Sequence, residues 1–426
     1  MKNIRLPEKV QFILETFRRG GFEAYIVGGC VRDSLMGRTP VDWDIATNAL
    51  PDRIKALFER TIDTGIKHGT VTIMISGDTF ETTTYRVDGR YTDNRRPENV
   101  TFTSSITEDL SRRDFTVNAM AYNPAEDIID PFGGIADIKN KLIRTVGNAD
   151  ERFHEDALRM LRAVRFSAQL GYRIDAAVLE SIQRNSLLIS HISFERIRGE
   201  LNGILLSDRP EAFELLRGTA LLHHISPQLD NAMGAKPDKN SEGRLTGRDI
   251  WETIKATEKE IWLRWAILLG SLDMIGGEPA AALLRKLRFD NRSINSISLL
   301  IRYIDMEITP ELKAVLRALS LTGKELFTDL LKLKGAWTVS AKDTENIRKI
   351  KELYQEIIEN NYCYSLEGLA VNGGDITALG VPPGKAVGDI LKKLLDIVLD
   401  NPGLNTKASL VEAAKGLVEE GRDKCF

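Results

Sequence analysis

Cysteine and histidine are scarce in this chain of 426 residues. Its three cysteines lie far apart and are never spaced as C-x-x-C: Cys30, Cys363 and Cys425. Neither a disulfide framework nor a zinc site is therefore indicated. None of the five histidines is followed by an aspartate, which argues against a metal-dependent phosphohydrolase of the His-Asp type.

Long apolar runs are also absent, so we expect no membrane-spanning segment and no membrane partner. The first residues, MKNIRLP, lead into a mixed amphipathic stretch and not into the apolar core of a signal peptide. We therefore expect a cytoplasmic protein. A length of 426 residues favours about two to four domains, and a 42% hydrophobic, 28% charged composition is ordinary for a globular chain.

The net charge of −3 does not by itself suggest a nucleic-acid partner. The arginines are unevenly distributed, however, and gather in two stretches: Arg86, Arg90, Arg95, Arg96, Arg112 and Arg113, then Arg159, Arg162 and Arg165. A local basic surface is what phosphate binding requires. The overall charge therefore does not exclude a partner that carries phosphates.

The most informative feature is the pair Asp42 and Asp44, separated by one tryptophan. The apolar segment 41–45 predicts a strand that carries both acids. Carboxylates at positions i and i+2 of a strand point to the same face, where they can share divalent cations for metal-assisted phosphoryl transfer. A lone D-x-D is more often a pair of surface acids, so the context has to decide.

Gly28 and Gly29 supply that context, because they follow the apolar segment 25–27 and precede a predicted helix start. Glycines in such a turn let backbone N–H groups approach a phosphate closely, and a helix N-terminus favours its charge. Arg32 adds a cation in the first turn. A strand, a glycine turn, a helix and an acidic strand in this order favour a nucleotide site.

Residues 1–150 alternate strand and helix signals. Segments 71–75 and 80–85 are rich in β-branched residues and flank Ser-Gly-Asp, which predicts a hairpin, and 99–103 and 127–130 predict further short strands. From about residue 150 the pattern is helical: 155–170, 176–189, 193–206 and 211–222, then again from 250 after a polar loop at 234–247. A turn-rich segment from residue 369 precedes two more amphipathic helices. We therefore predict an α+β fold with an all-helical remainder.

Two arginine-bearing motifs are candidates for nucleotide contacts. In segment 111–119, Arg113 is predicted to meet a triphosphate while Asp114 orients it, although an ordinary Arg–Asp pair at a helix start fits equally well. In the predicted helix 155–170, Asp156 and Arg159 are one turn apart. They could present a joint acceptor and donor edge to a base, or form a simple salt bridge on the helix surface.

Glu81 is a candidate for a third carboxylate. Glu81 lies on the strand before the arginine-rich segment 84–97, and it could face Asp42 and Asp44. Both this placement and an ordinary surface position stay open. The segment itself, with turn chemistry at Asp88-Gly89, is typical of an exposed loop.

The motifs GGCVRD, DWD, SRRDFTVNAM, DPFGG and EDALRMLRAVRF occur in this order. With them the chain resembles the class II tRNA nucleotidyltransferases, the family of CCA-adding enzymes and bacterial poly(A) polymerases within the DNA polymerase beta superfamily. The resemblance covers about residues 22–200, and the segment near Leu369–Asp375 is similar to short bacterial CCA-adding enzymes. Residues 225–365 match only in length and helical character.

The resemblance implies a sea-horse arrangement of four parts. These are an N-terminal nucleotidyltransferase head with a DNA polymerase beta-like sheet (1–150), a neck with nucleotide-base recognition (151–222), a helical body (223–365) and a helical tail (366–426). It also implies roles for the candidate residues. Asp42 and Asp44 would bind Mg²⁺ and activate the 3′-hydroxyl of tRNA for attack on the α-phosphate, with Glu81 as a further catalytic candidate.

The remaining candidates would bind the incoming nucleotide. The triphosphate would be held by Gly28, Gly29, Arg32 and Arg113. Asp156 and Arg159 would act as a protein template that pairs with CTP and then ATP, supported by Arg162 and Arg165. These roles are what the resemblance implies.

The product follows less directly from the sequence. The arginine-rich segment 86–97 is present and no long basic C-terminal extension occurs, so we expect addition of C, C and A to the 3′ end of tRNA. The alternatives are a CC-adding or A-adding specialist, a poly(A) polymerase, a nucleotidyltransferase for a small acceptor, and an RNA-binding module without activity. The oligomeric state is left open, with a homodimer as one option.

Overall fold

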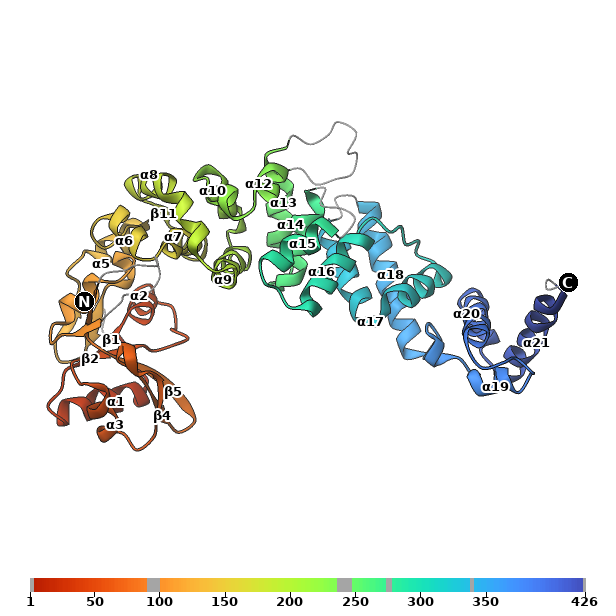
Figure 1. The fold of residues 1–426 in the computed structure, drawn as a ribbon, viewed down its shortest axis with the longest axis horizontal. Helices are drawn as coiled ribbons and strands as arrows, with labels where there is room; N and C mark the ends of the chain where they lie inside the picture. Colours follow the sequence, from red (N-terminus) through yellow and green to blue (C-terminus); the bar gives the residue numbers. More distant parts are fainter. Residues whose placement is uncertain (1–3, 90–99, 236–246, 273–277, 338–340, 424–426) are drawn as a thin grey trace. The chain divides into compact units, whose positions relative to one another are not determined.

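The computed structural model describes residues 4–89, 100–235, 247–272, 278–337 and 341–423. The chain divides into two compact units, residues 1–237 with 283–289 and residues 238–282 with 290–426. The first unit contains the β-sheet and the second is helical (Figure 1). The predicted α+β fold with a helical remainder is confirmed. Within the described residues, no helix is both long and apolar enough to cross a membrane.

A seven-stranded mixed sheet forms the centre of the N-terminal part, in the order β3-β4-β5-β2-β1-β8-β9. Its strands are β1 Ala24–Val27, β2 Ile45–Thr47, β3 Thr61–Gly65, β4 Thr70–Ile75, β5 Asp78–Thr84, β8 Ala121–Asn123 and β9 Asp127–Ile129. β2 pairs with β5 in parallel and the other neighbours are antiparallel. The hairpin predicted from 71–75 and 80–85 is confirmed as β4 and β5.

All four residues of β1 are buried because the sheet is covered on both faces. Ile26 belongs to the larger core, where it packs with residues of α1 such as Phe17, whereas Tyr25 and Val27 face a smaller cluster with Leu110. A short, wholly apolar strand is expected where both faces are covered. The helices of this part are α1 Glu8–Arg19, α2 Gly29–Leu35, α3 Pro51–Leu57, α4 Ile106–Ser111 and α5 Gly134–Asn140.

The predicted strand 99–103 is present as β7 (Val100–Phe102), with residue 99 outside the described part of the chain. It pairs with β6 (Arg86–Asp88) in a separate two-stranded sheet. This pair forms the described base of the arginine-rich segment. Arg90, Arg95 and Arg96 lie outside the described residues, as does most of the predicted loop 234–247.

The helical part of the first unit contains α6 Ala149–Glu155, α7 Leu158–Leu170, α8 Ala176–Asn185, α9 Phe194–Leu205, α10 Glu214–Gly218, α11 Leu221–Ile225 and α12 Pro227–Gly234. The prediction of one helix over 155–170 is wrong. The backbone of Asp156 is extended, and its carboxylate accepts the N–H of Leu158, the first residue of α7. Aspartate favours this capping role over a helix interior.

Two further helix predictions need shortening. α8 ends at Asn185 and is followed by a 3₁₀ turn over Ser186–His191. The segment predicted as one helix over 211–222 is divided into a 3₁₀ turn (Pro210–Phe213), α10 and α11, with a positive φ of 60° at Ala220. A left-handed residue cannot continue a right-handed helix, so the break at Ala220 has a local cause.

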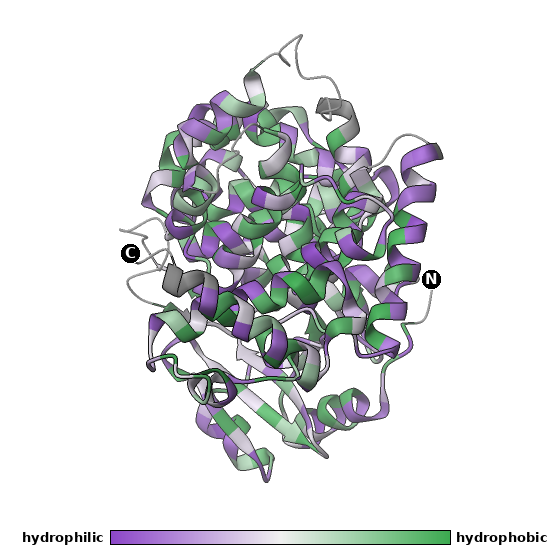
Figure 2. Ribbon diagram, turned by 90° about the vertical axis from the view of Figure 1, so that its right-hand side faces the viewer, coloured by the Kyte–Doolittle hydropathy of each residue, from purple (hydrophilic) through white to green (hydrophobic). Residues whose placement is uncertain are grey.

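The second unit comprises α13 Gly247–Ala256, α14 Ile261–Ser271, the start of α15 Glu278–Lys286, α16 Asn291–Tyr303, α17 Leu312–Trp337, α18 Ala341–Glu359, α19 Gly373–Thr377, α20 Lys385–Asp400 and α21 Lys407–Asp423. These helices carry apolar and polar residues together (Figure 2), as expected where one face is buried. The predicted turn-rich entry is confirmed: a capping box between Asn372 and Asp375 starts α19. The two predicted amphipathic helices are α20 and α21.

Gly134, the first residue of α5, allows a close approach of two backbone segments. A Cβ there would lie 2.3 Å from the carbonyl oxygen of Thr116 and 2.9 Å from Sδ of Met120. We expect Gly134→Ala to reduce the free energy of unfolding by about 1–3 kcal/mol, because the backbone must shift to relieve the overlap. Gly199→Ala, in the interior of α9 with no atom within 4 Å of the new Cβ, is the control. It should raise stability by about 0.5–1 kcal/mol. Equal midpoints of chemical denaturation for the two variants would contradict this account.

Candidate active site

A cleft of about 790 Å³ lies in the first unit, between the sheet and helices α7 and α9. Its size is in the range of small-molecule sites. It is strongly charged, with eight arginines and five carboxylates in its lining: Arg32, Arg86, Arg112, Arg113, Arg159, Arg162, Arg165 and Arg196, and Asp42, Asp44, Glu81, Asp114 and Asp156. Gly28 and Gly29 also line it, so every candidate site residue from the sequence lies in this one cleft.

Gly28 makes the turn between β1 and α2. Its φ of 78° and ψ of −131° are a conformation that only glycine adopts readily. A Cβ there would lie 3.0 Å from Nη1 of Arg113 and 4.0 Å from Oδ2 of Asp44. The predicted sequence of strand, glycine turn and helix is confirmed, and it places the glycine backbone beside both a cation and an acid.

Asp42 and Asp44 do not lie on a strand, which corrects the prediction for 41–45. β2 begins at Ile45, and the last bond of the ladder is donated by Val27 N–H to the carbonyl of Asp44 at 3.0 Å. β1 turns away at Gly28, so the residues before Asp44 have no strand to pair with on that side. Both acids nevertheless line the same cleft as Glu81 on β5, whose neighbour Thr82 pairs with Ile45.

None of these three carboxylates forms a salt bridge within the described part of the chain, in contrast to the arginines around them. The surrounding protein raises the pKa of Asp44, first by reducing its hydration and then through the negative charge of Glu81, with a further contribution from Asp42. Arg113 opposes this shift. A site that concentrates uncompensated carboxylate oxygen is suited to a hard divalent cation.

No three His, Cys, Asp or Glu side chains in the described part of the chain are close enough to form a complete metal cage. The carboxylate oxygens in the cleft suit a hard divalent cation, which can complete its shell with water and substrate phosphates. The residues present therefore fit a metal that binds together with a nucleotide.

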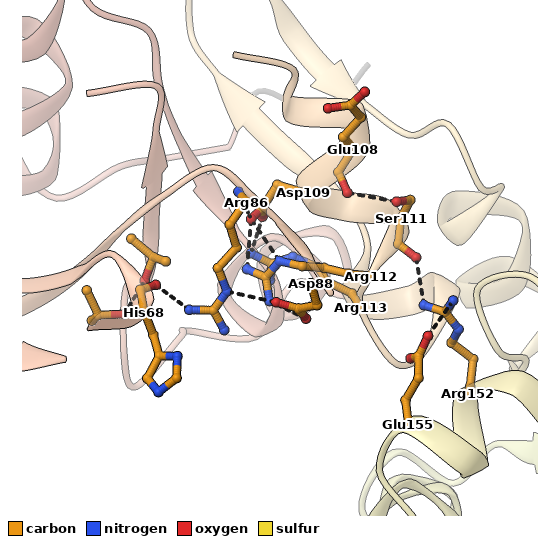
Figure 3. A network of polar contacts seen from close by, with 12 residues as sticks. His68, Arg86, Asp88, Glu108, Asp109, Ser111, Arg112, Arg113, Arg152 and Glu155 are labelled. Carbon is orange, nitrogen blue, oxygen red and sulfur yellow. Dashed lines mark hydrogen bonds and ion pairs between the residues drawn. The ribbon is translucent and has the colours of Figure 1, made fainter. Parts of the chain in front are cut away.

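Arg113 is held by Asp109 and not by Asp114, which corrects the predicted pairing. Asp109 is buried in α4 and accepts Nη2 of Arg113 at 3.2 Å and Nη2 of Arg112 at 2.7 Å (Figure 3). It also accepts the backbone N–H of Arg86 at 3.3 Å. Burial alone would raise the pKa of Asp109, but Arg113 and Arg112 outweigh it and lower that pKa. The sequence contained a signal for this, since Asp109 precedes the two arginines by three and four residues.

Asp114 instead binds Arg162 of α7, with Nε at 2.7 Å and Nη2 at 2.6 Å. Burial opposes ionisation, yet Arg162 and Arg159 together lower the pKa of Asp114 to about 2. A carboxylate this firmly ionised forms a stable counter-charge across the cleft. The contact joins residues 48 positions apart, so no local pattern predicts it.

Asp156 and Arg159 do not form the simple salt bridge with each other that was the alternative prediction, and each is held by another described residue. Asp156 accepts Nη2 of Arg196 in α9 at 2.7 Å and Nη1 at 3.2 Å. Arg159 binds Glu155 and donates Nη2 to the carbonyl of Arg112 at 3.0 Å. Both residues line the cleft, and their joint contact with a base stays a prediction. Arg196 was not recognised as a site residue, because its position at a helix start indicates only a cap.

The other two arginines are held in the same way. Arg32 donates to Asn118 Oδ1 and to both oxygens of Asp33, and Arg165 donates Nε to Glu200 at 2.6 Å. Asn118 and Glu200 are buried polar residues that the sequence reasoning missed. Asn118 belongs to the recognised segment 111–119, whereas Glu200 comes from α9 and has no sequence signal.

Three family models match the chain. The Poly A polymerase head domain matches residues 24–144, a probable RNA and SrmB- binding site of polymerase A matches residues 171–233, and a tRNA nucleotidyltransferase domain 2 matches residues 256–414. Among curated proteins, the CCA-adding enzyme of Limosilactobacillus reuteri is 37% identical over 435 residues, covering 99% of this chain and all of the relative.

Solved structures are similar over almost the whole chain. The Bacillus stearothermophilus CCA-adding enzyme in complex with CTP matches with a TM-score of 0.79 and 31% identity, covering 99% of this chain and 100% of the other. The Thermotoga maritima CCA-adding enzyme complexed with tRNA_CCA matches with a TM-score of 0.64, covering 97% of each chain. At 20% identity, that second likeness concerns the fold alone.

The raised pKa of Asp44 predicts an effect on stability. Asp44 has a higher pKa in the folded state than its ordinary value of 3.8. As the pH rises from 3.8 through the pKa of the folded state, ionisation of Asp44 therefore lowers the stability of the fold. We expect Asp44→Asn, measured without divalent metal, to raise the midpoint of thermal unfolding at neutral pH, with a smaller difference near pH 4. Added Mg²⁺ with CTP should stabilise the unsubstituted chain and not the variant. A lower midpoint for Asp44→Asn at neutral pH would show that the ionised carboxylate of Asp44 does not destabilise the fold.

Proposed function

This chain belongs to the CCA-adding enzymes, and on that basis we propose that Asp42 and Asp44 form its catalytic metal site. The enzyme adds C, C and A to the 3′ end of tRNA and takes the nucleotides from CTP and ATP, without a nucleic-acid template. The observation that carries the site assignment is one cleft in which carboxylates that form no salt bridge among the described residues face a set of anchored arginines. Such a cleft suits a metal-bound triphosphate.

The family uses a divalent metal, and we propose Mg²⁺. Support comes from the ligands, which are carboxylate oxygens, and from the small number of them. When bound, the cation neutralises charge on the triphosphate and makes the 3′-hydroxyl of tRNA a better nucleophile. Glu81 is proposed as an acid that adds negative charge beside Asp44.

The triphosphate is proposed to bind at Gly28, Gly29, Arg32 and Arg113. Gly28 leaves the backbone open to a phosphate, and Arg113 lies beside it. The guanidinium of Arg113 is already oriented by Asp109, so little side-chain freedom is lost on binding. Planar guanidinium groups suit phosphate oxygens because they donate two parallel hydrogen bonds.

Base selection is proposed to depend on Asp156 and Arg159, with support from Arg162 and Arg165. An ionised carboxylate has about four acceptor positions, so Asp156 can bind Arg196 and still accept from an exocyclic amino group of a base. Cytosine and adenine both carry such a group. A uracil or guanine presents a carbonyl oxygen at the corresponding position, which a carboxylate cannot bind.

We also propose the division into head (1–150), neck (151–222), body (223–365) and tail (366–426), supported for the head by the match of the Poly A polymerase head domain to residues 24–144. A cytoplasmic location is part of the same proposal, because tRNA is processed there.

Incorporation of labelled CTP and ATP tests the function, with tRNAs that end at the discriminator base, at C and at CC. We expect ordered addition of C, C and A that then stops. Asp42→Ala should abolish every addition and leave tRNA binding nearly unchanged, since the lost group contacts the metal and not the acceptor. Arrest after CC, or activity on the CC-ended tRNA alone, would make this a specialist. Near-normal activity of Asp42→Ala would remove the metal assignment.

The contact between Arg196 and Asp156 predicts that Arg196 takes part in base selection. Arg196→Ala should admit UTP and GTP because the Asp156 carboxylate loses its fixed orientation, and Asp156→Ala and Arg159→Ala should do so because each removes a proposed base-reading group. A pair of hydrogen bonds to a base gives about 1–3 kcal/mol of discrimination, so selectivity should fall roughly five- to 150-fold. Arg184→Ala is the control, since Arg184 is exposed and binds Asp150. An equal rate loss for all four nucleotides would contradict the selective role.

A further inference from the structure

Three guanidinium groups of the cleft surround one aromatic ring. The centroid of the Phe166 ring is 4.3 Å from Cζ of Arg165, 5.2 Å from Cζ of Arg162 and 5.4 Å from Cζ of Arg32. All three lie within the distance of about 6 Å at which a ring attracts a cation. Phe166 itself lines the cleft.

The three arginines come from two different elements. Arg162 and Arg165 lie on α7 with Phe166, whereas Arg32 lies on α2, directly after the glycine turn. The ring is therefore a contact shared by the predicted triphosphate-binding residue and the two residues predicted to support the nucleotide.

The ring has a fixed orientation. Phe166 is only 7% exposed, and its ring meets that of the fully buried Phe115 edge-on, with centroids 5.7 Å apart and planes at 81°. The side chain of Arg165 is also confined, because a Cβ at Gly203 of α9 would lie 2.4 Å from its Cδ. A rigid ring and a confined arginine stem define where the guanidinium group can lie.

Each arginine has its own acceptor: Asp33 and Asn118 for Arg32, Asp114 for Arg162, and Glu200 for Arg165. These contacts hold single arginines. They do not explain why three like charges converge on one point, where they repel one another. The negative face of an aromatic ring offsets part of that repulsion without adding an acid that would repel phosphate.

From this arrangement we propose that Phe166 is a positioning residue for nucleotide binding, which sets the places of the Arg32, Arg162 and Arg165 guanidinium groups through its ring face. Phe166 does not contact reacting atoms in this role. The inference rests on the proposed nucleotide site. It differs from a simple core role for Phe166 because it depends on the electron density of the ring and not on its volume.

Ring fluorination separates these two roles, because fluorine withdraws electron density from the ring face while the shape changes little. Phenylalanine with one, two or three ring fluorines would be introduced at position 166, and KM and kcat for CTP and ATP measured with the full chain. The same series at Phe153 is the control, since Phe153 is equally buried in α6 and has no guanidinium over its ring among the described contacts. Phe166→Leu keeps the apolar bulk and removes the ring face.

We expect KM for both nucleotides to rise stepwise with each fluorine at position 166, to roughly five- to thirtyfold for the most fluorinated ring and for Phe166→Leu. The change in kcat should be smaller, the thermal midpoint of the fluorinated chains should stay near that of the unsubstituted chain, and the Phe153 series should be flat. A flat KM series at position 166, or equal slopes at both positions, would overturn the proposal. An unsubstituted chain that adds neither C nor A would instead refute the proposed function.

Discussion

The turn at Gly28 is the constraint on which the rest of the site depends. With a positive φ at Gly28, β1 ends at Val27 and α2 begins at Gly29. The pairing of β1 with the chain before β2 therefore ends at Asp44. The acids are therefore presented at the end of a ladder and not within it. Because Gly28 has no side chain, Arg113 and Asp44 can both lie close to its Cα. Any side chain there would separate the cation from the acid.

Around that turn, the arginines form ion pairs or hydrogen bonds with other side chains, whereas three carboxylates form no salt bridge among the described residues. The arginines are anchored by acids such as Asp109, Asp114 and Glu200, so their guanidinium groups are oriented before any ligand arrives. The three carboxylates near Gly28 have no such anchors among the described residues. In such a site the arginine side chains need little rearrangement when a triphosphate binds, but the carboxylates still require a cation. Nucleotide binding is therefore linked to metal binding.

The local features of this site could be predicted from the sequence. A glycine pair between an apolar strand and a helix, β-branched segments around Ser-Gly-Asp, and arginines near acids each have a cause within a few residues. The prediction of one continuous helix through Asp156 was wrong, because the regular helical spacing gave no sign that the Asp156 side chain accepts the N–H of Leu158 at the start of the next helix. Contacts such as Asp114 with Arg162 could not be predicted, since they arise only when distant segments pack.

The proposed base-reading residues also depend on contacts between distant segments. The candidate reading groups come from the end of α6, the start of α7 and the first turn of α9, where Arg196 reaches Asp156. No single helix presents them. Under the proposed assignment, base choice depends on the packing of α7 against α9, where Gly203 leaves room for Arg165 and Glu200 binds it. Under that assignment, a small shift between these helices would move the proposed acceptor and donor groups relative to each other.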